Sequence, residues 1–157
     1  MNQHRMQTIG PAAPSTGDNG SANRLARIVL MLVIVELTLA TAYIHLGLGG
    51  LLFTLNGVGY LGLVTAYVAT TVVPITILQR FAWLARIGLA GYTVLTIGAY
   101  LAVGPHFVLG WITKGIEVAI VGLLMVDILG AYGSIRGLSN AAFDSFEALR
   151  SRAERHA

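Results

Sequence analysis

Four apolar segments, each about 20 residues long, constrain the fold of this chain more than any other feature of its sequence. They cover about residues 28–48, 56–78, 84–103 and 108–129. A helix rises about 1.5 Å per residue, so each segment can cross the roughly 30 Å hydrocarbon core of a bilayer. Charged residues make up only 11% of the chain, against roughly 25% in soluble proteins. We therefore expect an all-α integral membrane protein, with a four-helix bundle formed by residues 24–136.

The segments on either side of this domain are polar. Residues 1–23 are rich in Gly, Pro, Ser and Asn and carry too few apolar side chains to offset the entropy of ordering, which predicts a disordered tail. Residues 137–157 predict a short amphipathic helix on the cytoplasmic membrane surface, with a frayed, solvated tail as the alternative. The apolar residues at helical spacing in this segment are Ala142, Phe143, Phe146 and Leu149.

The distribution of arginines predicts the orientation. They lie before the first segment, around the connection between the second and third, and after the fourth, whereas residues 46–56 and 104–107 contain no Lys or Arg. Since positive residues stay on the cytoplasmic side, both termini are expected in the cytoplasm and the chain in the cell (plasma or inner) membrane. The net charge of +3 is therefore interpreted as topology and not as a nucleic-acid surface.

A secretory signal is an alternative interpretation of the first segment. Arg24 and Arg27 precede the run IVLMLVIV, and the small residues Ala40 to Ala42 resemble a cleavage site. Glu36 interrupts the apolar region, however, and YIHLGL continues the helical pattern beyond that site. We expect this segment to remain as the first span.

The connection between the first two spans is an apolar outer hairpin. Gly49 and Gly50 allow the chain to reverse, and LLFTL is expected in the outer headgroup zone or at an early start of the second helix. Asn56 is a strong residue type for capping that helix. The alternative is an outward-facing pocket between this hairpin and the segment GPHF, formed by His45, Asn56 and His106.

Three ionisable residues fall inside the predicted spans. Glu36 and Glu117 both approach the middle of the bilayer, and Lys114 lies three residues before Glu117, a spacing that permits contact. Charges at this depth are costly and mark function. The expectation is one charge cluster, which serves either as a clamp between helices or as a site for a proton or cation. Asp127 is expected near the inner end, in contact with water.

Small residues form a separate face on the fourth span. Gly115, Ala119 and Gly122 recur at packing intervals, and Glu117 lies roughly 200° from Gly115 at about 100° per residue. If Glu117 points inward, the small residues point outward. The expected partners are then the lipid bilayer and a second copy of the chain or another membrane subunit.

The function predicted from these features is a non-enzymatic accessory or binding subunit of a membrane assembly. The sequence contains no phosphate-binding glycine motif, nucleophile elbow or paired-histidine metal motif, and it has no cysteine. One alternative is proton- or cation-coupled transport of a small solute through Glu36 and Glu117. His45 lies on nearly the opposite helix face from Glu36, so a relay between them is not expected. Another alternative is haem, held by His45 and His106 at similar depth.

Overall fold

Helices form all the secondary structure of the residues that the structure describes. The structure is a computed structural model and describes residues 17–104 and 107–154. The elements are α1 (Gly17–Leu48), α2 (Leu51–Val72), α3 (Thr76–Arg80), α4 (Ala82–Val103), α5 (Val108–Tyr132) and α6 (Ile135–Glu154). Four of them, α1, α2, α4 and α5, are long and apolar enough to cross a membrane. The expected all-α fold class is confirmed, and the four expected apolar helices are present.

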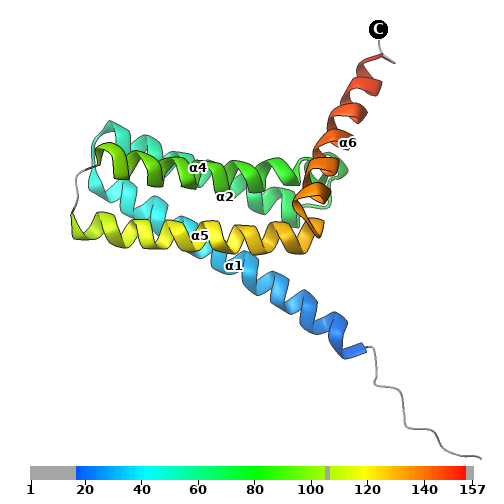
Figure 1. Cartoon of the computed structure of the whole chain (residues 1–157), viewed down its shortest axis with the longest axis horizontal. Helices are drawn as coiled ribbons and strands as arrows, with labels where there is room; N and C mark the ends of the chain where they lie inside the picture. Colours follow the sequence, from blue (N-terminus) through cyan, green and yellow to red (C-terminus); the bar gives the residue numbers. More distant parts are fainter. Residues whose placement is uncertain (1–16, 105–106, 155–157) are drawn as a thin grey trace, which may run out of the picture.

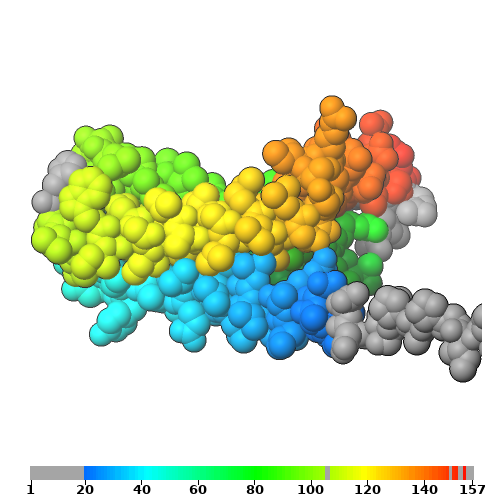
Figure 2. Space-filling view, turned by 60° about the horizontal axis from the view of Figure 1, so that its bottom comes forward, coloured from blue at the N-terminus to red at the C-terminus, as the bar shows by residue number. Residues whose placement is uncertain are grey.

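The four long helices lie side by side (Figure 1). Each packs against two others, in the cyclic order α1, α2, α4, α5. Figure 2 shows α5 lying along α1, with α6 rising at one end. Apolar side chains fill the centre of this four-helix unit, and the fully buried ones are Ile34, Tyr60, Tyr67, Leu89, Ile120 and Leu124. Large apolar residues on the outside, such as Val94 and Val118, are more than half exposed, which makes a surface suited to contact with lipid.

The unit has two chemically different ends. At the hairpin end, α1 turns into α2 through Gly49 and Gly50, whose φ angles of 71° and 84° suit glycine, and residues 104–107 connect α4 to α5. At the opposite end, here called the arginine end, lie the first turns of α1, α3, the start of α4 and α6. The described arginines all belong to these segments: Arg24, Arg27, Arg80, Arg86, Arg136, Arg150 and Arg152.

The bounds of α2 differ from the sequence-based expectation at both ends. The helix begins at Leu51 directly after the glycine turn, so LLFTL is helical and Asn56 lies in the second turn. Gly50 occupies the cap position, and the expected cap by Asn56 is wrong. At the other end α2 stops at Val72 instead of continuing to residue 78. Pro74 has no N–H to donate and forces the preceding Val73 into an extended conformation, so α2 ends there.

Helical structure begins earlier in the chain than the composition indicates, and the helix expected within residues 137–157 is present as α6. α1 begins at Gly17, so residues 17–23 of the predicted tail are helical, while residues 1–16 lie outside the described ranges. α6 docks on the arginine end through Leu138 and Ser145, which are buried. Nε1 of Trp83 donates to Oγ of Ser145 at 3.3 Å. The one proton of that hydroxyl is shared between the carbonyl of Ala141 at 2.6 Å and that of Arg80 at 3.0 Å. Phe143 and Phe146 stay exposed.

Candidate functional site

A buried carboxylate on α5 links all four long helices. Oε2 of Glu117 accepts hydrogen bonds from Nζ of Lys114, one turn earlier, and from Oγ1 of Thr96 on α4 at 3.1 Å. The hydroxyl of Tyr60 on α2 lies 2.7 Å from that of Thr96. The single hydroxyl proton of Thr96 is directed to Glu117 or to the carbonyl of Thr93, so Tyr60 is the donor in this contact. Nε2 of His45 on α1 lies 3.7 Å from Oε1 of Glu117. These residues are called the Glu117 network.

His45 presents an acceptor nitrogen to Glu117. Its Nδ1 lies 2.8 Å from the carbonyl oxygen of Thr41, so Nδ1 carries the proton and donates. In the neutral ring Nε2 is then an acceptor that faces Oε1 of Glu117, another acceptor. That oxygen has no hydrogen-bond partner among the described residues, and neither do Oγ1 of Thr41 and Oδ1 of Asn56. Buried polar atoms normally find a partner, so each of these three atoms can accept one further hydrogen bond.

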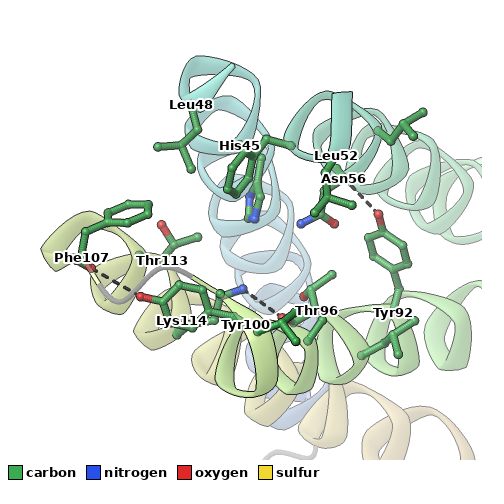
Figure 3. Close-up of a pocket in the computed structure, with 17 residues that line it drawn as sticks. His45, Leu48, Leu52, Asn56, Tyr92, Thr96, Tyr100, Phe107, Thr113 and Lys114 are labelled. Carbon is green, nitrogen blue, oxygen red and sulfur yellow. Dashed lines mark hydrogen bonds between the residues drawn. The ribbon is translucent and has the colours of Figure 1, made fainter. Parts of the chain in front are cut away.

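A cavity of about 330 Å³ opens beside this network at the hairpin end. All four long helices line it. Figure 3 shows His45, Asn56, Thr96 and Lys114 pointing into one space. The apolar lining residues are Leu48, Leu52, Phe53, Leu55, Leu95, Ala99, Val103 and Phe107. The cavity therefore combines apolar walls with a few convergent polar groups, the usual character of a small-molecule site.

Lys114 is the charged group on the wall of this cavity. Its side chain is almost fully buried, and its ammonium pairs with Glu117 and lies 5.4 Å from the ring centroid of Tyr100. The carbonyl of Thr96 is a further, longer contact at 3.4 Å. A carboxylate, an aromatic face and a carbonyl therefore hold the ammonium at the edge of the cavity, where a ligand can reach it.

The structure brings together two of the three residues of the expected charge cluster and separates the third. Glu36 is exposed on the outside of α1, and none of the ion pairs among the described residues includes it. The cause is helix periodicity, because Glu36 shares a face with Tyr43, which is 79% exposed. His45 lies on the opposite, buried face. The expectation of a single cluster that includes Glu36 is corrected to a Lys114–Glu117 pair facing His45.

The other predicted residues fall in two places. His45 and Asn56 line the cavity, whereas His106 lies outside the described residues. The haem hypothesis therefore has one described histidine, whose Nε2 faces a buried carboxylate. Gly115, Ala119 and Gly122 are exposed on the outer face of α5.

Two features of the structure escaped the sequence analysis. Tyr60 and Thr96 complete the Glu117 network. A sequence signal for Thr96 did exist, because counting residues from the hairpin end places it at about the same depth as Lys114. At the arginine end, Nε of Arg86 donates to Oδ2 of Asp127 at 2.8 Å, and the hydroxyl of Tyr67 donates to the same oxygen at 3.1 Å. Asp127 was expected only to reach water.

The site can hold a molecule and exchange hydrogen bonds with it. Lys114 and Glu117 neutralise each other, while Asn56 and Oε1 of Glu117 keep unused acceptor capacity. Among the described residues no group of three or more His, Cys, Asp or Glu side chains is placed to hold a metal ion. Comparison of the chain with protein families, with curated proteins and with solved structures gave no match.

Proposed function

We propose that the chain is a non-enzymatic membrane binding protein that holds a small amphipathic molecule in the cavity at its hairpin end. The observation that carries this proposal is the convergence of His45, Asn56 and Lys114 on an apolar cavity of about 330 Å³. A volume of this size lies at the lower end of the range for small-molecule sites, roughly 300 to 1,000 Å³.

The lining residues specify the chemistry of the ligand. The leucine and phenylalanine side chains around the opening suit a hydrocarbon or ring body. Oδ1 of Asn56 lacks a donor, so an O–H or N–H group on the ligand would satisfy it. Lys114 would favour an electron-rich oxygen on the same ligand. Since the ammonium is already paired with Glu117, a neutral polar group fits better than a second full negative charge.

Filling the cavity should abolish ligand retention. Ala99 lines the cavity, and Ala99→Phe would place a ring in it. The matched control is Ala102→Phe, one turn further along α4 at an exposed position outside the lining. Native mass spectrometry of the purified protein is expected to show a co-purifying small molecule in wild type and in the control, and about tenfold less or none in Ala99→Phe. Equal amounts in the two variants would contradict the proposal.

We further propose a cell-membrane location with both termini in the cytoplasm. The described arginines gather at one end of the four-helix unit, whereas the connecting segments at the opposite end, residues 46–56 and 104–107, contain no Lys or Arg. This asymmetry is the pattern that orients membrane proteins with their positive side inward. The cavity, which is at the hairpin end, then lies in the outer half of the membrane.

The outward-facing small residues of α5 form a surface on which a partner helix could pack. A Cβ atom added at Gly115 or Gly122 would meet no other residue within 4 Å, so both positions are open. Because Glu117 on the same helix is fully buried, these residues lie on the far side from the network. Small residues allow close helix contact in lipid. We propose that this face packs against a second copy of the chain or another membrane subunit.

Association through this face should be lost when it is made bulky. Gly115→Leu with Gly122→Leu is expected to shift the protein to a monomer in detergent, measured by size-exclusion chromatography with light scattering. The open space around both glycines means that the four-helix unit itself should keep its thermal stability. Val94→Leu, at an exposed position of α4 away from this face, is the control. A monomeric wild type without any co-purifying subunit would show that this face has no such partner.

A further inference from the structure

A second, larger crevice lies at the arginine end, far from the cavity described above. It has a volume of about 1010 Å³ and lies between the first turns of α1 and the ends of α2 and α5. Figure 1 shows why it exists, because the N-terminal part of α1 leaves the other helices. Arg24, Arg27 and Arg86 line this space together with one acidic residue, Asp127. It is called the arginine crevice.

The charge of the arginine crevice is unbalanced. Three arginines against one aspartate leave two positive charges. Arg86 is buried at the inner wall, where Asp127 neutralises it. Arg24 and Arg27 are exposed and take part in none of the ion pairs of the described residues. Nη2 of Arg27 donates to the carbonyl of Gly130 at 2.6 Å, which holds this guanidinium against the end of α5. The crevice is therefore a site for negative charge.

Apart from Asn23 and Thr71, the remaining lining residues of the crevice are apolar or glycine, and several are exposed. Ile28, Val72 and Val126 line it and are 46%, 59% and 57% exposed. These side chains belong to helices that can cross a membrane, so the surface that they expose is suited to hydrocarbon chains. A free anion would use only the arginines. A molecule with both a negative group and a hydrocarbon chain would use the whole crevice.

We propose that the arginine crevice binds an anionic phospholipid, with the phosphate between Arg24 and Arg27 and an acyl chain along Ile28 and Val126. Basic pockets between transmembrane helices recognise lipid headgroups in this way, and a guanidinium fork matches phosphate oxygens. Arginines that serve only to orient the protein in the membrane need not line one common crevice, as Arg24 and Arg27 do. Arg136 and Arg150 do not line the crevice, and Arg150 pairs with Glu154 instead.

The test measures lipid binding to the purified full chain in detergent by native mass spectrometry. Wild type is titrated with phosphatidylglycerol, with phosphatidylcholine and with inorganic phosphate. Arg24→Gln with Arg27→Gln should weaken phosphatidylglycerol binding about 30-fold, because each arginine near a lipid surface contributes about 1 kcal/mol and 1.4 kcal/mol is tenfold. Arg136→Gln with Arg150→Gln removes the same charge elsewhere at this end and should bind as wild type does.

A second variant tests the apolar wall without changing either arginine. Val126→Trp would fill the crevice and is expected to weaken phosphatidylglycerol binding, whereas Val118→Trp, equally exposed on α5 outside the crevice, should not. The proposal fails if phosphatidylcholine binds as tightly as phosphatidylglycerol, or if the two double-arginine variants behave alike. It also fails if inorganic phosphate competes with the lipid at equal concentration, because the acyl chain then contributes nothing.

Discussion

Lys114→Met is expected to lower the free energy of unfolding by about 3 to 5 kcal/mol, the cost of leaving one partner of a buried ion pair alone. The substitution keeps most of the side-chain volume and removes only the ammonium. Glu117 is 0% exposed and would lose the ammonium of Lys114 that neutralises it. Among the described residues, only a protonated His45 could then supply a positive charge next to this carboxylate. Reversible unfolding in mixed detergent micelles measures the loss.

The opposite substitution should cost much less. Glu117→Gln keeps a side-chain carbonyl that can accept from Thr96. It leaves Lys114 unpaired, but Lys114 lines the cavity, so its ammonium can turn towards water or ligand there. The double variant Lys114→Met with Glu117→Gln carries no buried charge and should recover most of the stability lost in Lys114→Met. Recovery of stability in the double variant would show that the loss in Lys114→Met comes from the unpaired charge and not from lost packing.

Glu36→Gln is the matched control for Glu117→Gln. Glu36 is exposed on α1 and has no ion-pair partner among the described residues, so its amide variant should be as stable as wild type or more stable. The cost of a carboxylate in lipid, about 2.5 to 3.5 kcal/mol on insertion scales, would be avoided. If Lys114→Met is as stable as wild type, the Lys114–Glu117 ion pair does not contribute to the stability of the four-helix unit.

The sequence predicts those features that depend on a single helix. Segment length and apolar content predict the four spans, and a period of 3.6 residues places His45 and Glu36 on opposite faces of α1. The pairing of Lys114 with Glu117 follows from their spacing on α5. The exposure of Gly115 follows from the same rotation once Glu117 is known to be buried.

Features that depend on two or more helices were missed or misjudged. Glu36 and Glu117 have similar predicted depths, but depth does not say how each helix is rotated about its axis. The contact of Thr96 with Glu117 and that of Arg86 with Asp127 depend on these rotations and on helix order. The residue type of Asn56 favoured a helix cap, yet the two positive φ angles of Gly49 and Gly50 let α2 begin at Leu51, before Asn56.

Asp127→Leu is expected to lower the free energy of unfolding by about 3 kcal/mol, the second large effect. The carboxylate accepts from Nε of Arg86 at 2.8 Å and from the hydroxyl of Tyr67 at 3.1 Å. Arg86 would keep its hydrogen bond to the carbonyl of Ala82 and its place 5.7 Å from the ring centroid of Tyr67. Neither contact replaces a full negative charge, so the guanidinium would remain buried without its counter-ion.

Three comparisons identify the cause of that loss. Arg86→Leu with Asp127→Leu removes both charges and should be more stable than Asp127→Leu alone, because no buried guanidinium is left unpaired. Asp144→Leu, at an exposed position of α6, should change stability by less than about 0.5 kcal/mol. Since Arg86 also lines the arginine crevice, phosphatidylglycerol should raise the melting temperature of Asp127→Leu more than that of wild type, by supplying the missing negative charge. If the double variant is less stable than Asp127→Leu, the packing of Arg86 against Tyr67 and Tyr132 matters more than its charge.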